Sequence, residues 1–544
     1  MISGILAFGV LEITNASRLR KTEVSNSHDR YSWNRPGASV QLLRYGQPKE
    51  AGMVVSPLNE IDQGIQNAIN QKVMPGAVVS ITRKGITVKE QAYGYAYRYL
   101  DDQFTESENP ILMKKDTIFD IASISKIFTS IAVMQLFEKG KLLLDDTVAT
   151  YIPEFAVNGK DNITIRQLLT HTSGFESGIP LYQMGETREE RLEIVLKHGL
   201  VNPPGTKYMY SDLNMITLGV LVERLTGQRL DEYMKQNITE PLGMKDTMYN
   251  PPVSLKPRIA ATEYQPWTGR DLVWGQVHDE NAWSLDGVAG HAGLFSTAHD
   301  LTTLGQIFLN KGKYGQTQIL KPTTVALMEQ NMNQAFPDSD HGLGFELNQG
   351  WYMDALSDVN TMGHTGYTGT SLVISLKNKT IVILLTNRVH PTRQTISINQ
   401  TRRLVARKTA DAIPVSISGH KKAWFAGYGD NKKSILQAEV NIQKPSTLIF
   451  QTWYRMEKDA DFGKVESSQD GILWHELDTI TGASDQWQKQ SYQLPIGTKF
   501  VRFQYATDNS VNGRGWYVLQ PKIKTGNKEI VPQFISNDWI QRDW

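Results

Sequence analysis

A change of pattern near residues 412–420 splits this chain into two unlike parts and limits the folds that it can adopt. Before that point, segments with a helical spacing of apolar residues are mixed with two strong strand pairs, at 76–96 and 370–387, which turn at Lys84–Gly85 and Lys377–Lys379. After it come only short β-branched and aromatic runs separated by turns. The sequence therefore predicts a part that mixes helices and strands, followed by an all-β sandwich.

We expect three segments: 1–50 as a leader or tether, 51–412 as a first domain and 420–544 as a second. At roughly 150 residues per domain, the length allows two to four domains. Residues 2–13 form an apolar run that fits the core of a signal peptide, but no basic residues precede it and Glu12 interrupts it, so a partly ordered N-terminus is the alternative. No other run approaches the roughly 18 apolar residues that span a bilayer.

The composition excludes several classes of function. A formal net charge of +1 gives no basis for a nucleic-acid partner or a polybasic membrane patch. Because the chain has no cysteine, it has no disulfide, no Cys-ligated metal and no thiol nucleophile. The absence of cysteine also suits a secreted bacterial protein.

The segment FDIASISKIFTS places Ser123 and Lys126 three residues apart at the start of an apolar helical pattern, so both lie on one helix face. A serine hydroxyl becomes a good nucleophile only when a nearby base takes its proton, and a lysine amine can do so. The N–H groups at a helix N-terminus also point towards a developing oxyanion. The same spacing recurs in Ser418–Lys421, which no apolar helical pattern follows, and an N-cap serine is the alternative interpretation of Ser123.

Two further elements carry polar groups suited to the same chemistry. In Tyr210-Ser211-Asp212, a tyrosine held against the serine and lysine can relay a proton to the leaving group, although a core tyrosine is the alternative. In His364-Thr365-Gly366, a small residue lets a strand edge approach the substrate, and the N–H of Tyr367 can supply an oxyanion donor. The alternative there is a glycine-rich strand entry with a surface histidine.

Taken in this order, Ser-x-x-Lys, Tyr-x-(Asn/Asp) and (Lys/His)-Thr-Gly resemble the signature set of serine β-lactamases and penicillin-binding proteins. The chain is most similar to the class C-like branch, which also holds D-Ala-D-Ala carboxypeptidases and esterases. The resemblance implies an α/β (α+β) β-lactamase/transpeptidase-like fold, in which helices flank an antiparallel sheet beside an all-helical region. It covers about residues 52–410 and includes LLTHTSGF (168–175), VHDENA (277–282), GVAGHAGLFSTAHDL (287–301) and HGLGFEL (341–347).

The resemblance implies a role for each matching residue. Ser123 forms an acyl-enzyme and Lys126 assists its deprotonation. Tyr210 acts as general acid/base, with His364 beside it where lysine is commoner, and the choice of acylation base between Lys126 and Tyr210 stays open. The N–H of Ser123 forms one half of the oxyanion hole. The other residues expected in the oxyanion hole or against the substrate are Asp212, Thr365, Gly366 and Tyr367.

Two residues depart from the β-lactamase pattern. Asp212 stands where asparagine is usual; an ionised carboxylate cannot donate a hydrogen bond to the substrate, and close to Lys126 it favours the protonated lysine. His364 replaces lysine, and its charge at neutral pH stays open. Both departures favour peptidase or esterase activity over efficient β-lactam hydrolysis.

Residues 420–544 resemble the jelly-roll modules that are appended to secreted bacterial proteins, such as immune-inhibitor-type metallopeptidases. The resemblance rests on segments around Trp424, Asp461, Trp474 and Trp516-Tyr517. Their aromatic side chains suit a core better than a sugar platform, and a carbohydrate or cell-wall contact stays open. Asp461 and Asp508 are candidate ligands of a structural Ca²⁺.

No cofactor is expected, and no metal in the catalytic site. Four histidines lie in family-like loops without a His-x-x-x-His helical pair, so we interpret them as structural. They are His171, His278, His291 and His299.

The leading hypothesis is a D-Ala-D-Ala carboxypeptidase-like serine hydrolase, secreted or associated with the bacterial cell envelope, that acts on peptidoglycan stem peptides or another small acyl substrate. The alternatives are an esterase on small acyl or D-alanyl esters and a β-lactamase. A non-catalytic penicillin-binding protein is a further class, against which the intact set of Ser123, Lys126 and Tyr210 argues.

Overall fold

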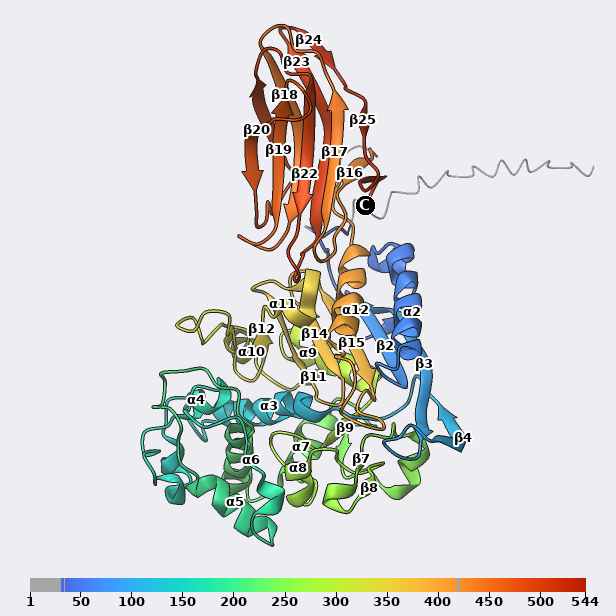
Figure 1. The fold of residues 1–544 in the computed structure, drawn as a ribbon. Helices are drawn as coiled ribbons and strands as arrows, with labels where there is room; N and C mark the ends of the chain where they lie inside the picture. Colours follow the sequence, from blue (N-terminus) through green and yellow to red (C-terminus); the bar gives the residue numbers. More distant parts are fainter. Residues whose placement is uncertain (1–30, 34, 418–420) are drawn as a thin grey trace, which may run out of the picture.

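The main sheet of the protein combines strands from the beginning and from the end of the segment that precedes the β-sandwich. The computed structural model describes residues 31–33, 35–417 and 421–544. Figure 1 shows a lower body of helices around a sheet and an elongated β structure above it. The sheet has the strand order β1-β3-β2-β15-β14-β13-β12, with β4 beside β3. Its strands are β1 (Arg44–Tyr45), β2 (Gly76–Arg83), β3 (Ile86–Tyr99), β4 (Glu106–Leu112), β12 (Glu346–Leu347), β13 (Thr361–Thr365), β14 (Ser371–Ser375) and β15 (Thr380–Thr386).

Both predicted strand pairs are confirmed, as β2–β3 and β14–β15. They meet where β15 runs antiparallel to β2, with Ile383 opposite Ser80. The edge pair β1–β3 is parallel, and the other pairs in this sheet are antiparallel.

Helices cover both faces of this sheet, which is why β2, β14 and β15 are buried along their whole length. Side chains alternate between the faces of a strand. Val78 accordingly packs into the core that contains α3 and α9, whereas Val79 packs into the core under α2 and α12. The covering helices are α2 (Val55–Asn70), α3 (Ser125–Glu138), α9 (Ala298–Leu309) and α12 (Asn399–Asp411).

Helix α3 runs through the centre of the lower body, and its residues from Ser125 to Leu136 are all buried. A helix buried on every side needs apolar residues all round, as this one has. The predicted helical region packs against it. Its helices are α4 (Ile165–Leu169), α5 (Arg188–Lys197), α6 (Asp212–Thr226), α7 (Leu230–Met234) and α8 (Glu280–Ser284).

Short elements complete the lower body, and several of them border the site described below. They are η1 (Pro48–Ala51), β5 (Phe119–Asp120), η2 (Ala122–Ile124), β6 (Met248–Tyr249), β7 (Tyr264–Gln265), β8 (Asp271–Leu272), β9 (Leu294–Ser296), β10 (Lys313–Tyr314), β11 (Thr317–Gln318), α10 (Pro322–Met328) and α11 (Gly350–Met353).

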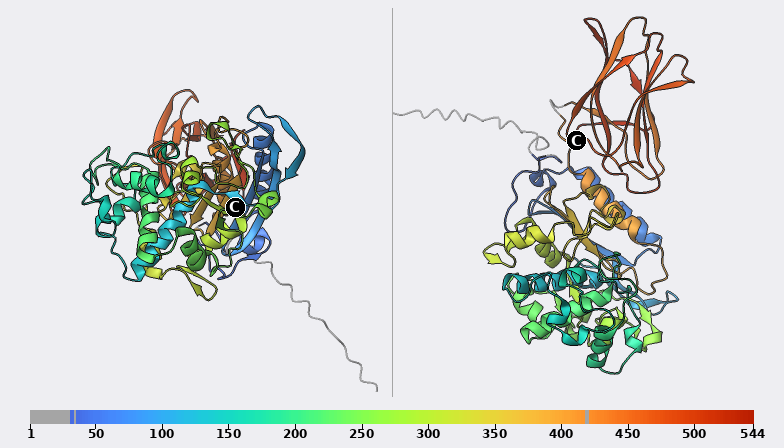
Figure 2. Two further views of the ribbon diagram at one scale, coloured as in Figure 1. Left: turned by 90° about the horizontal axis from the view of Figure 1, so that it is seen from below. Right: turned by 90° about the vertical axis from the view of Figure 1, so that its left-hand side faces the viewer.

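The predicted β-sandwich is confirmed as two antiparallel sheets, which face each other in the right-hand view of Figure 2. Alternate residues of β17 and β22 are buried, and Leu436, Phe503 and Trp516 belong to the core between the sheets. The strands are β16 (Ala423–Phe425), β17 (Lys433–Glu439), β18 (Ser446–Arg455), β19 (Phe462–Ser468), β20 (Trp474–Ile480), β21 (Gln488–Leu494), β22 (Phe500–Ala506), β23 (Gly515–Thr525), β24 (Lys528–Ile530), β25 (Phe534–Ile535) and β26 (Ile540–Arg542).

The sandwich packs directly on the lower body. Trp453 and Tyr517 of the sandwich share one apolar cluster with residues of α2 and α12. Asp411 at the end of α12 is 5% exposed and pairs with two sandwich arginines, Arg514 at 2.8 Å and Arg542 at 2.7 Å. Through these contacts the β-sandwich packs against α2 and α12 of the lower body.

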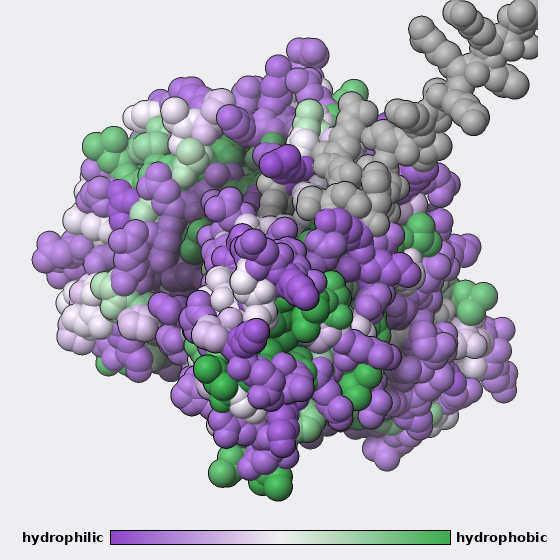
Figure 3. All heavy atoms as spheres, turned by 90° about the horizontal axis from the view of Figure 1, so that it is seen from above, coloured by the Kyte–Doolittle hydropathy of each residue, from purple (hydrophilic) through white to green (hydrophobic). Residues whose placement is uncertain are grey.

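Residues 1–50 were expected to be a leader or tether, but the described residues of this segment pack against the first domain. Trp33 is 2% exposed in the cluster under α2, Arg44–Tyr45 form β1, and Pro48–Ala51 form η1. Residues 1–30, which include the signal-peptide candidate, and Ser418 of the second Ser-x-x-Lys copy lie outside the described residues. Among the described residues, no helix has the length and apolar character needed to cross a membrane. Viewed from the sandwich end, the surface is mostly hydrophilic with scattered apolar areas (Figure 3).

Candidate active site

Ser123 lies in a tight turn between β5 and α3. The turn is the short helix η2, and α3 itself starts two residues after Ser123. Ala122 has a φ of +46°, a conformation that is strained for alanine. The Asp120 carboxylate, which is buried, accepts a hydrogen bond from the Ala122 N–H at 2.8 Å and so holds this conformation. The turn places the Ser123 hydroxyl at the N-terminal end of the helix.

Lys126 is buried behind the Ser123 hydroxyl, with 1% of its side chain exposed. Its ammonium donates to Ser123 Oγ at 2.8 Å and to the His291 carbonyl at 2.9 Å. Its third neighbour is the Asp212 carboxylate, at 2.8 Å. Burial lowers the pKa of Lys126, but the charges of Asp212 and Tyr210 outweigh it, so the pKa lies above the usual lysine value.

The Tyr210 ring stands beside this pair. Its centroid is 4.9 Å from Lys126 Nζ and 4.6 Å from the His171 ring. Burial raises the pKa of Tyr210 to about 12, although hydrogen bonding to Lys126 and Ser123 and the lysine charge lower it. The structure therefore brings Ser123, Lys126 and Tyr210 together within hydrogen-bonding reach.

His364 projects from β13, with its ring 6.0 Å from that of Tyr210. Its Nδ1 lies 2.8 Å from the Thr365 carbonyl and donates to it, so Nε2 carries the free lone pair. Burial and the charge of Lys126 lower the pKa of His364 to about 3. His364 is thus a neutral imidazole at neutral pH and does not reproduce the positive charge of a lysine.

Gly366 lets the end of β13 approach the turn that carries Ser123. A Cβ at this position would lie 2.5 Å from the Ile121 carbonyl, so any larger residue would push the two segments apart. Thr368 ties the same loop to the turn by donating to the Asp120 carbonyl at 2.7 Å. From the other side, Arg402 donates to the Gly366 carbonyl at 2.8 Å. Tyr367 follows, with its side chain 52% exposed.

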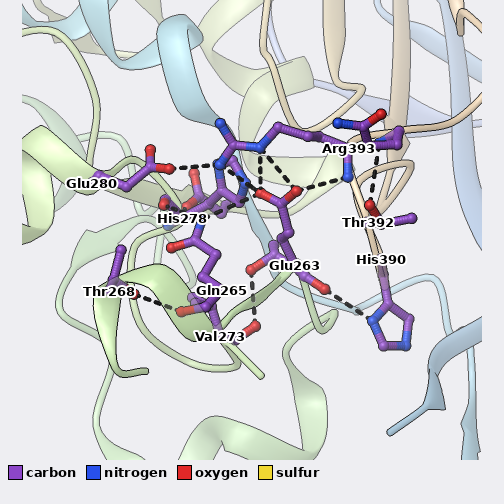
Figure 4. Close-up of polar contacts among 12 residues, drawn as sticks. Glu263, Gln265, Thr268, Val273, His278, Glu280, His390, Thr392 and Arg393 are labelled. Atoms are coloured by element: carbon purple, nitrogen blue, oxygen red, sulfur yellow. Dashed lines mark hydrogen bonds and ion pairs between the residues drawn. The ribbon is translucent and has the colours of Figure 1, made fainter. Parts of the chain in front are cut away.

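A polar network that includes Glu263, His278 and Arg393 (Figure 4) adjoins Tyr367 through the His278 ring. The His278 ring stacks on the Tyr367 ring at 5.8 Å, and its Nε2 lies 2.8 Å from the buried Glu263 carboxylate. Arg393 also binds Glu263, at 2.6 Å. The backbone N–H of His278 donates to Asp120 at 2.6 Å, which connects this network to the Ser123 turn.

These groups surround a cavity of about 510 Å³. Lys126 lies behind its wall, and Asp212 is not part of the lining but pairs with Lys126. The lining residues that the sequence predicted are Ser123, Tyr210, His364, Thr365, Gly366 and Tyr367; those it missed include Tyr208, Glu346, Trp351, Arg388, Asn399 and Arg402.

Glu346 is the missed residue for which the sequence held a signal, because it belongs to the family-like segment HGLGFEL. No sequence pattern indicated that Arg388 or Arg402 would line the cavity. Neither arginine forms an ion pair with any carboxylate in the described part of the chain, although burial lowers the pKa of both guanidinium groups. Their hydrogen bonds run to backbone carbonyls, Thr395 and Asn399.

The four histidines that we interpreted as structural, and not as metal ligands, have different hydrogen-bonding neighbours. His171 accepts hydrogen bonds from the Ser211 N–H and the Asn214 amide at 3.1 Å each. His278 pairs with Glu263 as described, and His291 lies 2.9 Å from Asp279. The Oγ1 of Thr303 donates to the backbone carbonyl of His299 at 3.3 Å.

Within the described ranges of the chain, two groups of three side chains are close enough to share an ion. Asp212, Asp279 and His291 form the first, but Lys126 already pairs with Asp212. In the sandwich, Asp461 and Asp508 lie together with Glu457.

Comparisons with known proteins agree with this geometry. Residues 61–407 match the family model described as Beta-lactamase. A protein of Salmonella agona (strain SL483), provisionally named a D-alanyl-D-alanine carboxypeptidase, is 35% identical over 381 residues, which cover 64% of this chain and 87% of that protein. A protein of Salmonella schwarzengrund (strain CVM19633) with the same name matches equally well.

Solved structures share the fold. EstCE1, described as a hydrolase with promiscuous acyltransferase activity, superimposes with a TM-score of 0.51 and 26% identity, covering 64% of this chain and 99% of that one. A class C β-lactamase, at 19% identity, gives a TM-score of 0.54 and covers 66% of this chain and 98% of that one, which supports the fold alone. The chain therefore belongs to the β-lactamase family, and it is a serine hydrolase.

Proposed function

We propose that this hydrolase is a D-Ala-D-Ala carboxypeptidase that acts on cell-wall peptides through an acyl-enzyme on Ser123. The observation that carries the proposal is the pair of arginines, Arg388 and Arg402, in the same cavity as Ser123. A carboxypeptidase must recognise the free carboxylate at the end of its substrate, and arginine binds carboxylates through charge-assisted hydrogen bonds.

The arginines support this because neither forms a direct ion pair with a carboxylate of the described residues; Glu346 acts on Arg402, and Glu263 on Arg388, only from beyond 4.0 Å. A buried charge without a partner of opposite sign is costly. Arg402 is 7% exposed, and it donates hydrogen bonds to the carbonyl oxygens of Gly366 and Thr370 and to the amide oxygen of Asn399. Arg388 donates to the Arg393 carbonyl and to Thr395 through one terminal nitrogen, Nη2, while its Nε–H has no acceptor among the described residues. A substrate carboxylate would supply the missing negative charge.

The residues around Ser123 suit the acyl transfer. The hydroxyl attacks the carbonyl of the penultimate D-Ala in the form of the enzyme in which Lys126 or Tyr210 has lost its proton; that group accepts the hydroxyl proton and then delivers a proton to the leaving D-Ala amine. The N–H groups of Ser123 and Tyr367 stabilise the oxyanion. Water then attacks the ester carbonyl, which releases the shortened peptide and restores the Ser123 hydroxyl.

The test compares two peptides that differ only at the C-terminus: acyl-D-Ala-D-Ala and the same peptide as a C-terminal amide. We expect D-Ala release from the first with a kcat/KM at least about 10-fold above the release of D-alaninamide from the second, as for a charge-assisted bond. Arg388→Gln should remove most of that preference while sparing a small ester without a carboxylate. Arg258→Gln is the matched control, because Arg258 pairs with Asp246 outside the cavity. Equal rates for both peptides would contradict the proposal.

An esterase is the second candidate, and the similarity to EstCE1 at 26% identity favours it. The neutral His364 and the Asp212–Lys126 pair also argue against a dedicated β-lactamase. Rapid cleavage of small acyl esters without D-Ala release would favour the esterase, and rapid turnover of penicillins would favour a β-lactamase.

We further propose that the enzyme works at the bacterial cell envelope, with 51–412 as catalytic domain and 420–544 as accessory domain. The names of the Salmonella relatives support this location. A carbohydrate contact would have to use exposed residues of the sandwich, since Trp516 and Tyr517 are fully buried.

A further inference from the structure

Exposed aromatic side chains gather around the cavity beside Ser123. The described residues include five of them: Tyr45, Trp267, Trp283, Trp351 and Tyr367. Trp351 and Tyr367 line the cavity, and charged side chains connect Trp267 and Trp283 to Tyr367. Only Tyr45 lies elsewhere, on β1. Large aromatic side chains that gather on one surface indicate a binding site.

Arg393 joins Trp267 to Tyr367. The guanidinium carbon of Arg393 lies 5.1 Å from the centre of the Trp267 ring and 5.6 Å from that of the Tyr367 ring. Figure 4 shows that Glu263 and Glu280 hold this arginine, each at 2.6 Å. The two rings therefore flank one fixed guanidinium group, and Trp267, in the turn between β7 and β8, continues the surface that Tyr367 begins at the cavity.

Trp283 extends this surface along α8. It lies three residues after Glu280 and hence on the same face of the helix. The Glu280 carboxylate accepts a hydrogen bond from the Trp267 indole N–H at 3.3 Å, so the two tryptophans are neighbours. The guanidinium carbon of Arg270 lies 4.6 Å from the centre of the Trp283 ring, which is 37% exposed.

A packed side chain supports each of the three rings, so they are exposed and at the same time held in place. His278 stacks on Tyr367 with the ring planes 24° apart, and the two arginines lie against the tryptophans. Tyr367 is nevertheless 52% exposed and Trp267 51%. A ring that is packed on one side and exposed on the other offers a flat apolar face to a ligand at little further cost in side-chain entropy.

A sugar ring has the chemistry that matches this surface. One face of a pyranose carries C–H groups, which pack on the negative face of an aromatic ring, and its edge carries hydroxyl and amide groups, which hydrogen-bond to charged side chains. Arg270 and Glu280 supply such charged groups beside the tryptophans. The surface also continues into the cavity that receives the peptide, and the stem peptides of a cell wall are attached to a chain of amino sugars.

We propose that Trp267, Trp283 and Tyr367 form a platform for the glycan strand to which the stem peptide is attached. The inference rests on the proposed carboxypeptidase function and adds that the substrate is glycan-linked peptide and not free peptide. The sugar rings lie on the aromatic side chains, and the peptide reaches from there to Ser123. This platform lies on the lower body and is separate from any contact that the β-sandwich makes.

The test compares D-Ala release from one stem peptide in two forms, free and attached to a short glycan chain. The wild-type enzyme should favour the attached form by about 10-fold in kcat/KM, as expected when one ring is well stacked. The difference should lie in KM with kcat unchanged, because the platform holds substrate and transition state alike. Trp267→Leu keeps the apolar bulk without the flat ring and should reduce the preference to less than about 3-fold, whereas Trp267→Tyr should keep most of it.

Tyr45→Leu is the matched control. Tyr45 is 61% exposed and hydrogen-bonds to Glu90, away from the cavity, so this variant should keep the full preference. Every variant should cleave the free peptide as wild type does, and labelling by a fluorescent penicillin reports whether the Ser123 site is folded. A wild-type enzyme without a preference, or a Trp267→Leu enzyme that keeps it, would overturn the proposal.

A second readout separates this inference from the proposed function. Glycan strands stripped of their peptides are titrated into each variant in a calorimeter, which requires no D-Ala release. Binding that is weakened in Trp267→Leu and Trp283→Leu but not in Tyr45→Leu would support the platform even if the carboxypeptidase activity failed. A wild-type enzyme that releases D-Ala but does not bind the strands would overturn the platform alone. Self-association that Trp267→Leu abolishes, without glycan binding, would also overturn it and assign the surface to a protein contact.

Discussion

The Lys126–Asp212 pair makes the pH dependence of this enzyme predictable. Asp212→Asn keeps the shape of the side chain and removes one negative charge that lies 2.8 Å from the lysine ammonium. That charge raises the pKa of Lys126, and it also contributes to the raised pKa of Tyr210. Removing it lowers both values. The acid limb of the acylation rate should therefore move to lower pH whether Lys126 or Tyr210 accepts the Ser123 proton.

The size of the shift follows from the distance. At an effective dielectric constant of about 20, Coulomb's law gives about 6 kcal/mol for unit charges at this separation. The Asp212 side chain is 28% exposed, so solvent screens part of the interaction. Half of that energy, about 3 kcal/mol, corresponds to about 2 pKa units. We expect the acid limb to move down by about 2 pH units if Lys126 accepts the proton, and by less if Tyr210 does, since Asp212 is a smaller cause of its shift.

The assay is the acylation rate with a chromogenic ester or a fluorescent penicillin, followed from pH 6 to pH 10.5 by stopped flow; because both candidate bases have raised pKa values, the wild-type rate should still rise at the alkaline end of this range, whereas that of Asp212→Asn should level off earlier. Glu223→Gln is the matched control, since Glu223 lies on the same helix, α6, and pairs with Arg188 away from Ser123. Its profile should coincide with that of wild type. An acid limb that stays in place in Asp212→Asn, or moves to higher pH, would refute the assigned role of this carboxylate.

Three further predictions follow. Ser123→Ala should abolish penicillin labelling and reduce turnover by at least about 10³-fold; retained labelling would exclude Ser123 as nucleophile. Glu263→Gln should cost about 3 kcal/mol in urea unfolding at pH 7. Burial raises the pKa of Glu263, but His278 and Arg393 together bring it to about 2, so its contribution is lost as pH falls from about 5 to 2 and the variant should approach wild type there. Asp411→Asn, by unpairing Arg514 and Arg542, should cost about 3 kcal/mol and leave the kcat of the remaining folded enzyme unchanged.

Local patterns in the sequence were sufficient for much of the fold. The turn at Lys84–Gly85, the apolar helix after Ser123 and the short strands beyond residue 420 each depend on neighbours only a few positions apart. Such periodicities reflect which face of an element is buried, so they can be interpreted without knowing what covers that face. The spacing of Ser123 and Lys126 belongs to this class, and the structure places their side chains 2.8 Å apart.

The sequence alone determined that the chain carries a serine–lysine pair at a helix start, on a mixed fold followed by a β-sandwich. Only the tertiary structure decided what surrounds that pair. Because β15 joins β2 across about 300 residues, segments without a common local pattern meet at one cavity. Glu346 reaches the cavity from β12, Arg388 from the loop after β15 and Arg402 from α12, whereas Asp212 pairs with Lys126 instead of lining the cavity. Charge balance in a buried site depends on these long-range neighbours, which no spacing along the chain reveals.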